Sequence, residues 1–250
     1  ILAAALMLCS CAPAGLPTGT GATWHLVIIG DSSLWEVGEA YAARIEKDTG
    51  VKVILDDFST SAMSAGNVLS VLRSGVSDNA RMQKLPQALK EAEVVVMFVN
   101  PNLSIDPARP LDFDGCFISA APAECEPAAF ERWTEDLKAI WAEILKLRQG
   151  KATILRATDL YNPSVSSWKA HGVFEACTRC WLNMSDATRL AAEAYRIPFL
   201  GRYAAMNGPD RSEDIVAKGY ISDGEHLSPS GAQRVADLLA QMGYQPVTPP

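Results

Sequence analysis

A regular alternation of short apolar runs with longer segments of helical periodicity constrains the fold of this chain most strongly. The apolar runs are continuous and rich in Val and Ile, which is typical of strands buried on both faces of a parallel sheet. Strands that alternate with helices predict an α/β fold in which helices cover both faces of that sheet. The expected strands are Trp24 to Ile29, Val51 to Leu55, Val94 to Val99, Ala152 to Ala157 and Ile197 to Gly201.

The helical segments between these strands favour a single domain over residues 23–245. A chain of 250 residues with 48% hydrophobic content is long enough to bury one full α/β core. The Pro-rich residues 246–250 are expected to form a loose tail. The expected helices are Val37 to Lys47, Asn67 to Arg73, Arg81 to Ala92, Phe130 to Leu147, Cys177 to Tyr195 and Gln233 to Met242.

Two segments depart from the alternation, Pro101 to Pro127 and Asp159 to Val173. Both follow expected strands, so they are predicted to be long loops at the carboxyl edge of the sheet, where sites in such folds gather. We interpret them as walls of a substrate site. Trp35, Phe58, Phe98 and Trp168 are candidates for lining an acyl pocket, although isolated aromatic residues more often belong to the core.

The first fourteen residues carry no charge and are almost entirely apolar, which is too short for a membrane-spanning helix and typical of a signal-peptide core. Residues 1–22 are therefore interpreted as a leader and linker. Leu8-Cys9-Ser10-Cys11 resembles a bacterial lipobox, which predicts a lipid on Cys11 as the only membrane contact. The alternative is soluble secretion with cleavage after Ala12-Pro13-Ala14. Both alternatives place the folded domain outside the cytoplasm.

Export would place the remaining four cysteines in an oxidising compartment, where an even number suits two disulfides. The short intervening loops favour pairing Cys116 with Cys125 and Cys177 with Cys180. The alternative for Cys177-Thr-Arg-Cys180 is a redox pair, or half of a zinc site with His171 nearby. The formal net charge of -7 excludes nucleic acid as a favoured partner, because that binding rests on Lys and Arg at phosphates.

The first strand leads into Gly30-Asp31-Ser32-Ser33, and a helical pattern begins almost at once. Ser32 is therefore expected at a strand-to-helix turn on the carboxyl edge of the sheet, where its hydroxyl is exposed. The alternative is a plain helix cap, because Ser is a favoured capping residue.

A base for Ser32 is found near the other end of the chain, in the segment Ser222 to Pro229. Serine needs a base to become a nucleophile, usually His, and a carboxylate normally orients that His. Asp223 and His226 are three residues apart, within one tight turn. Of the other histidines, His25 falls in the first strand and His171 in a predicted loop, so His226 is the best candidate base.

These residues resemble the SGNH/GDSL hydrolase family over nearly the whole predicted domain. Gly30-Asp31-Ser32 is similar to the nucleophile block, and Asp223-x-x-His226 is similar to the terminal block. Gly66 resembles the glycine whose N–H serves the oxyanion hole, and Asn100 resembles the asparagine that completes the hole. The chain departs from the family's Gly-x-Asn-Asp, since it has Phe98-Val99-Asn100-Pro101; Asn102 is the alternative donor.

The resemblance implies a three-layer, flavodoxin-like fold with a five-stranded parallel sheet. It also implies ester hydrolysis without a metal or cofactor, through an acyl-enzyme on Ser32. Asp223 and His226 would complete the catalytic triad, and the N–H groups of Ser32 and Gly66 would meet the oxyanion with Asn100. Small-molecule and glycan esters both fit as substrates, and the sequence does not specify an oligomeric state.

Three alternatives remain at this point. Ser64, within Ala62 to Gly66, imitates the nucleophile elbow of α/β-hydrolases, but seven residues separate it from the strand residue Asp56, whereas an elbow joins strand and helix directly. The same residues would also support acyl transfer to a polysaccharide of the cell envelope. A surface lipoprotein that binds without catalysis is the third alternative, and the intact Ser32, Asp223 and His226 argue against it.

Overall fold

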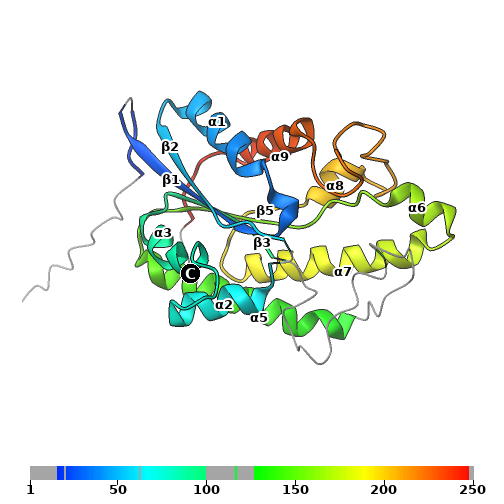
Figure 1. The fold of residues 1–250 in the computed structure, drawn as a ribbon, viewed down its shortest axis with the longest axis horizontal. Coiled ribbons are helices and arrows are strands. Elements are labelled where there is room, and N and C mark those ends of the chain that lie inside the picture. The colour runs from blue at the N-terminus through cyan, green and yellow to red at the C-terminus, as the bar shows by residue number, and fades with distance from the viewer. Residues whose placement is uncertain (1–15, 20, 62, 100–115, 117–126, 248–250) are drawn as a thin grey trace, which may run out of the picture.

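The computed structural model describes residues 16–19, 21–61, 63–99, 116 and 127–247. Over these residues the chain forms a five-stranded, wholly parallel sheet in the order β2-β1-β3-β4-β5, which confirms the predicted architecture (Figure 1). The strands are β1 (Thr23–Gly30), β2 (Lys52–Asp57), β3 (Val94–Phe98), β4 (Ile154–Thr158) and β5 (Phe199–Leu200).

The predicted strands agree with the observed ones to within about two residues at each end. The central strands β3 and β4 are buried along their whole length, as continuous apolar runs predict. The last strand is shorter than its sequence suggests, because only Phe199 and Leu200 pair, with Ala157 and Thr158 of β4. The chain then turns directly into a helix, which ends the pairing.

Helices form a layer on each face of the sheet (Figure 1). The helices α1 and α9 pack together on one face, and α2, α3, α5 and α7 lie on the other. Their bounds are α1 (Val37–Thr49), α2 (Ala65–Ser74), α3 (Leu85–Glu91), α5 (Pro127–Arg148), α6 (Val165–Ala170), α7 (Phe174–Glu193), α8 (Arg202–Asn207) and α9 (Pro229–Gln241); η1 (Ser32–Leu34) and η2 (Met82–Lys84) are short 3₁₀ turns. None of the described helices is both long and apolar enough to cross a membrane.

The position of β1 determines where a site can form. This strand lies between β2 and β3, and the helices that follow these two inner strands in the chain, α1 after β1 and α5 after β3, lie on opposite faces of the sheet. The carboxyl end of parallel strands at such a point is the usual place for a ligand in open α/β sheets. Ser32 is the second residue after β1 and therefore lies at this switch point.

The observed structure adds elements that the sequence pattern did not predict. The helix α6 lies within the segment 159–173, which was expected to be a loop, and α8 follows β5 directly. Both helices have six residues, too few to establish a helical period. At the C-terminus, Val247 pairs with Thr153 in an isolated bridge, so the chain still contacts the sheet region two residues into the predicted tail.

The predicted disulfide pairings are wrong. Cys116 is bonded to Cys177, with Cα atoms 5.6 Å apart, which excludes both the Cys116–Cys125 and the Cys177–Cys180 pairs. Cys180 is also disulfide-bonded, so neither cysteine of the Cys-x-x-Cys is a free thiol for redox cycling or for zinc. Cys125 lies outside the described residues.

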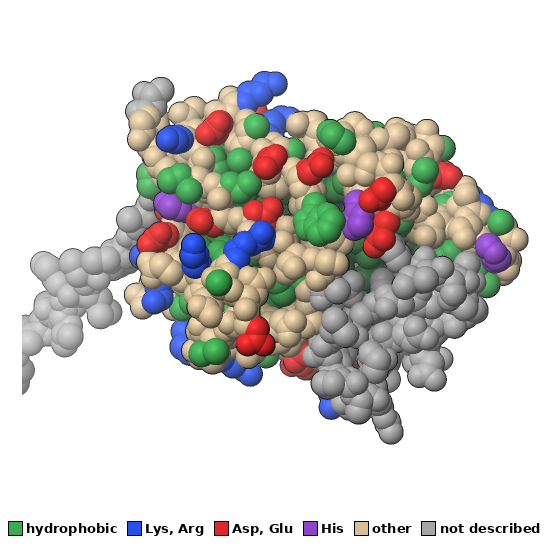
Figure 2. All heavy atoms as spheres, viewed as in Figure 1, with side chains coloured by type: hydrophobic (Ala, Val, Ile, Leu, Met, Phe, Trp, Pro, Cys, Tyr) green, Lys and Arg blue, Asp and Glu red, His purple; other side chains and the backbone are tan. Residues whose placement is uncertain are grey.

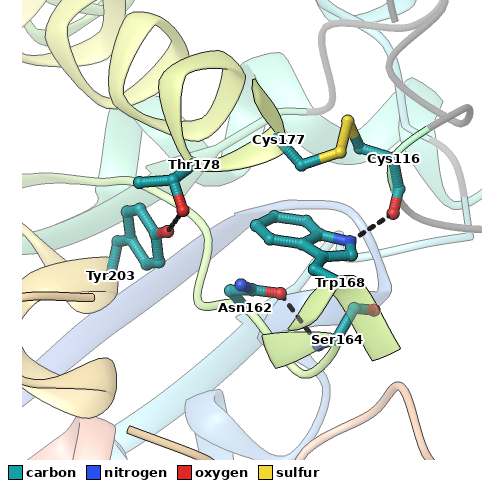
Figure 3. The surroundings of a disulfide bond; sticks show 7 residues. All are labelled: Cys116, Asn162, Ser164, Trp168, Cys177, Thr178 and Tyr203. Carbon is teal, nitrogen blue, oxygen red and sulfur yellow. Dashed lines mark hydrogen bonds between the residues drawn. A yellow bond between two sulfur atoms is a disulfide. The ribbon is translucent and has the colours of Figure 1, made fainter. Parts of the chain in front are cut away.

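The physical reason is that both cysteines of the Cys-x-x-Cys lie near the start of the long helix α7 and point into the protein. Figure 3 shows Cys177 reaching Cys116, whose carbonyl oxygen accepts a hydrogen bond of 2.6 Å from the Trp168 indole. Cys116, Trp168 and Cys177 are all buried. The bond therefore joins the segment after β3 to α7 through a dry, aromatic contact.

We expect the Cys116→Ala/Cys177→Ala double variant to lose roughly 4 kcal/mol of unfolding free energy, because the bond closes a loop with a sequence separation of 61 residues. For a domain of this size that corresponds to a melting temperature lower by about 8 to 16 °C, measurable by calorimetry. Non-reducing peptide mapping of the wild-type protein is the control. A tryptic peptide in which Cys177 is linked to Cys180 would contradict the observed pairing.

Candidate active site

The turn after β1 is built so that only glycine fits at its first position. A Cβ on Gly30 would stand 2.5 Å from the Phe98 carbonyl oxygen and 2.5 Å from Leu34 Cδ1. The next residue, Asp31, caps the 3₁₀ turn η1 by accepting a hydrogen bond of 2.9 Å from the Ser33 N–H. The Gly-Asp pair thus fixes a sharp exit from the strand, and Ser32 begins the turn.

The two serines of this turn differ in their surroundings. Ser33 is buried, whereas Ser32 is half-exposed. A half-exposed hydroxyl at the carboxyl edge of the sheet is accessible to a substrate. The alternative prediction for this segment, a plain helix cap, applies to Asp31 rather than to Ser32, because the Asp31 carboxylate supplies the capping oxygen.

A fully buried arginine, Arg202, holds the turn from below. Its Nη1 donates to the Ser33 carbonyl oxygen at 2.8 Å, and its Nη2 donates to the Ser33 hydroxyl at 3.1 Å. Its Nε donates to the carbonyl oxygen of Asp159, just after β4. The guanidinium also lies over the rings of Phe98 and Tyr161, at 5.3 and 5.5 Å from their centroids. One side chain therefore connects the ends of β1, β3 and β4.

The carboxyl group of Asp159 accompanies this buried cation. It accepts hydrogen bonds from the Ser185 hydroxyl at 2.6 Å and from the Tyr203 N–H at 3.2 Å. Burial raises the pKa of Asp159 from 3.8 to about 6, although these hydrogen bonds and the nearby Arg202 oppose that shift. The folded protein therefore holds a proton at Asp159 at pH values where an unfolded aspartate has released it.

The predicted base and its partner form one local unit in the turn before α9. Asp223 Oδ2 lies 2.8 Å from His226 Nδ1, and Asp223 Oδ1 accepts the N–H groups of Glu225 and His226 at 3.0 and 2.7 Å. These hydrogen bonds, with that from the His226 backbone as the largest contribution, hold the pKa of Asp223 well below its usual range. Asp223 therefore stays a carboxylate and keeps Nδ1 protonated, which leaves Nε2 to accept a proton.

Contacts with two other segments hold this turn, one of them the segment that carries Ser32. The imidazole of His226 stacks on the indole of Trp35, with ring centroids 4.8 Å apart and planes 20° apart. The Trp35 N–H in turn donates to the Ser32 carbonyl oxygen at 3.1 Å. On the other side, the Tyr161 hydroxyl donates to the Glu225 carbonyl oxygen at 3.0 Å. Figure 2 shows a histidine with acidic side chains beside it at the surface of this face.

Gly66 lies in the first turn of α2, beside the same edge of the sheet. Its N–H is one of those that an α-helix leaves without an intrahelical partner, and the residue is exposed. The segment before α2 lies beside the end of β1, because the Thr60 N–H donates to the Gly30 carbonyl oxygen at 3.0 Å. Ser64 is buried and caps α2 by accepting the Asn67 N–H, and such a serine is poorly placed to attack a substrate.

The remaining predicted residues lie elsewhere. His25 is in β1 beside Asp56, 3.3 Å from its carboxylate, and His171 is exposed with Nδ1 2.8 Å from the Ser167 carbonyl oxygen. Within the described part of the chain no group of three or more His, Cys, Asp or Glu side chains forms a metal site. The predicted residues Cys11, Asn100 and Asn102 lie outside the described residues.

Sequence reasoning did not single out Arg202 or Asp159. The one available signal was a charged residue soon after an expected strand end. A charged residue at such a position is normally exposed to solvent. Of the aromatic residues proposed for an acyl pocket, Phe58, Phe98 and Trp168 belong to the buried core. Trp35 is 41% exposed and is the only one of the four at the surface.

No family model matches the sequence, and no curated protein matches it. Solved structures do match. A lipase from a goat rumen metagenome has a TM-score of 0.59 at 20% identity, over 89% of this chain and 98% of its own. An acetyl xylan esterase has a TM-score of 0.52 at 15% identity, over 88% of this chain and 99% of its own.

A third match is a protein assigned to the G-D-S-L lipolytic family from Desulfitobacterium hafniense, with a TM-score of 0.52 at 15% identity. It covers 87% of this chain and 98% of its own. All three similarities extend over most of both chains, and at these identities they report on architecture. The chain therefore has the fold of the SGNH/GDSL hydrolases, as its Gly-Asp-Ser and Asp-x-x-His blocks predict.

Proposed function

We propose that the protein is a serine hydrolase that cleaves carboxylic esters, with Ser32 as nucleophile, His226 as base and Asp223 as its orienting carboxylate. One observation carries this proposal: the His226 ring, with Asp223 at its Nδ1, stacks on Trp35, and the Trp35 backbone N–H donates to the Ser32 carbonyl oxygen. Ser32 and the Asp223–His226 pair come from opposite ends of the chain, and the stacking of His226 on Trp35 supports their acting together. The esterase and lipase neighbours support the same reaction class.

The reaction follows from the chemistry of these groups. Ser32 Oγ attacks the ester carbonyl carbon while His226 Nε2 takes its proton, and Asp223 stabilises the imidazolium that forms. The negative oxygen of the tetrahedral intermediate is met by the N–H groups of Ser32 and Gly66 and by the Asn100 amide. Collapse expels the alcohol, which receives the proton from His226. Water then attacks the carbonyl carbon of the acyl-enzyme while His226 takes its proton. Collapse of this second intermediate returns the proton to Ser32 Oγ and releases the acid.

We also propose that the protein works outside the cytoplasm. The Cys116–Cys177 bond supports this, because disulfides persist mainly in oxidising compartments. The apolar first fourteen residues support it independently. Lipidation at Cys11 and soluble secretion both fit this proposal, and the mass of the N-terminal peptide of the exported protein distinguishes them.

We expect Ser32→Ala to lower kcat for p-nitrophenyl acetate by more than about 10⁴-fold, because the acyl-enzyme can no longer form. Ser64→Ala is the matched control. It removes the cap of α2 and should reduce unfolding free energy by about 1 kcal/mol while leaving most of the activity. A phosphonate probe located on Ser64 by peptide mass spectrometry would overturn the assignment of the nucleophile.

We expect Asp223→Asn to lower kcat by at least about 100-fold and by up to about 10⁴-fold. The asparagine retains a side-chain oxygen for the N–H groups of Glu225 and His226, so the turn should persist. Its amide N–H₂ would face Nδ1 instead of a carboxylate, which favours the wrong tautomer of His226. Steady-state kinetics together with an unchanged melting temperature would check this. Full activity in Asp223→Asn would remove Asp223 from the triad.

Asn100→Ala tests the proposed oxyanion donor. A donor that acts mainly when negative charge develops should affect the transition state, so kcat is expected to fall by about 100- to 1000-fold with little change in KM. Asn102→Ala is the matched control, and both rates are normalised to the serines that a phosphonate titrates. Normal kcat in Asn100→Ala with a large loss in Asn102→Ala would transfer the role to Asn102.

A further inference from the structure

The ring of His226 has a distinct neighbour on each of three sides. Asp223 lies at Nδ1, at 2.8 Å, and the Glu225 carboxylate lies 3.9 Å from Nε2. The third neighbour is the Trp35 indole, which stacks on the face of the ring. The His226 side chain is 23% exposed, while Asp223 and Glu225 are 55% and 51% exposed. Water therefore reaches the edge of the ring, and the indole covers a face.

Core packing does not explain the position of Trp35. The neighbouring Leu34 and Val37 are fully buried, whereas Trp35 is 41% exposed. Glu36, between them, has a left-handed φ of 64°, which is uncommon for a residue with a side chain. The chain thus leaves the nucleophile turn in a conformation that directs its largest side chain toward His226 instead of the interior.

An indole face favours a cation over a neutral ring. The π-system of Trp is negative at its face, and it attracts an imidazolium more strongly than an imidazole. Covering a ring face also removes water, which acts in the opposite direction by favouring the neutral form. Because water still reaches the edge of the His226 ring beside two exposed carboxylates, the attraction should exceed the loss of hydration.

We propose that Trp35 is a positioning residue for the proposed base: it fixes the plane of the His226 ring and stabilises the imidazolium that forms when Ser32 loses its proton. This inference rests on the role of His226 proposed above. It also assigns a function to the end of the turn that carries Ser32. One short segment supplies both the attacking hydroxyl and the indole that contacts His226 when its ring becomes positively charged.

The other charged groups around the ring do not replace this contribution. Asp223 and Glu225 belong to the same turn as His226 and are present whether or not Trp35 is changed. Tyr161 bonds the Glu225 carbonyl oxygen, and burial raises the pKa of Tyr161, so that it stays neutral. Asp31 and Arg202 are buried and are bonded to Ser33. Substitution of Trp35 therefore removes the indole without adding or removing a charged group beside His226.

The test uses the fact that the chain has three histidines. With histidine labelled at ¹³Cε1, each ring gives one NMR signal, and His226→Asn identifies the signal of His226. In Trp35→Leu, which keeps an apolar side chain without a π-face, the pH midpoint of that signal should fall by about half a pH unit, the size expected of an exposed cation–π contact. Trp35→Phe, which keeps an aromatic face, should fall by less. The signals of His25 and His171 are internal controls.

Kinetics supply the second readout. The acidic limb of the kcat/KM profile for p-nitrophenyl acetate should move to lower pH in Trp35→Leu, in step with the NMR midpoint, and kcat should fall several-fold with little change in KM. An unchanged or higher midpoint in Trp35→Leu, or equal shifts in the Leu and Phe variants, would overturn the proposal. The NMR titration needs no catalysis, so a failure of the proposed function, seen as full activity in Ser32→Ala, is a separate result.

Discussion

The buried guanidinium of Arg202 is the interaction on which the geometry of the candidate site depends. A charge taken out of water is tolerated only if its donors are satisfied. Here all three donating nitrogens meet oxygens of Ser33 or Asp159, and two aromatic rings lie beside the plane. Removing Arg202 would therefore take away the donors that it gives to the carbonyl oxygen and hydroxyl of Ser33, next to the proposed nucleophile Ser32. The position of Ser32 thus depends on a side chain that is itself fully buried.

The proposed nucleophile, Ser32, and the proposed base, His226, are held in different ways. The turn of Ser32 is fixed by buried contacts to three strand ends, and glycine at position 30 is required by the closeness of Phe98 and Leu34. His226 instead lies in an exposed turn whose geometry comes from hydrogen bonds to Asp223 within the turn itself. Such a local unit depends little on the core, and its contacts with Trp35 and Tyr161 then set its place relative to Ser32.

This difference also explains what could be predicted from the sequence. Asp223 and His226 are three residues apart, and Ser32 is the second residue after a strand, so local spacing was sufficient to propose them as site residues. The strands were predictable because continuous apolar runs are typical of strands that are buried on both faces of a sheet. The pairing of Cys116 with Cys177 was not predictable, because it depends on where α7 packs in space and not on loop length. Arg202 was missed for a similar reason: its burial results from neighbours that are distant in sequence, Ser33 among them.

The same disulfide imposes an order on the maturation of the chain. Cys177 and Cys180 become available together, three residues apart, whereas the native partner of Cys177 lies 61 residues away. Short loops close faster than long ones, so oxidation of a chain that has not yet formed α7 favours the wrong, local bond. Conversion of that local bond into the native one is a thiol–disulfide exchange, in which the Cys116 thiolate attacks the Cys177 sulfur and Cys180 leaves as a thiolate; its rate depends on access and thiolate content. Formation of the native pairing therefore calls for reshuffling of disulfides as well as oxidation of thiols.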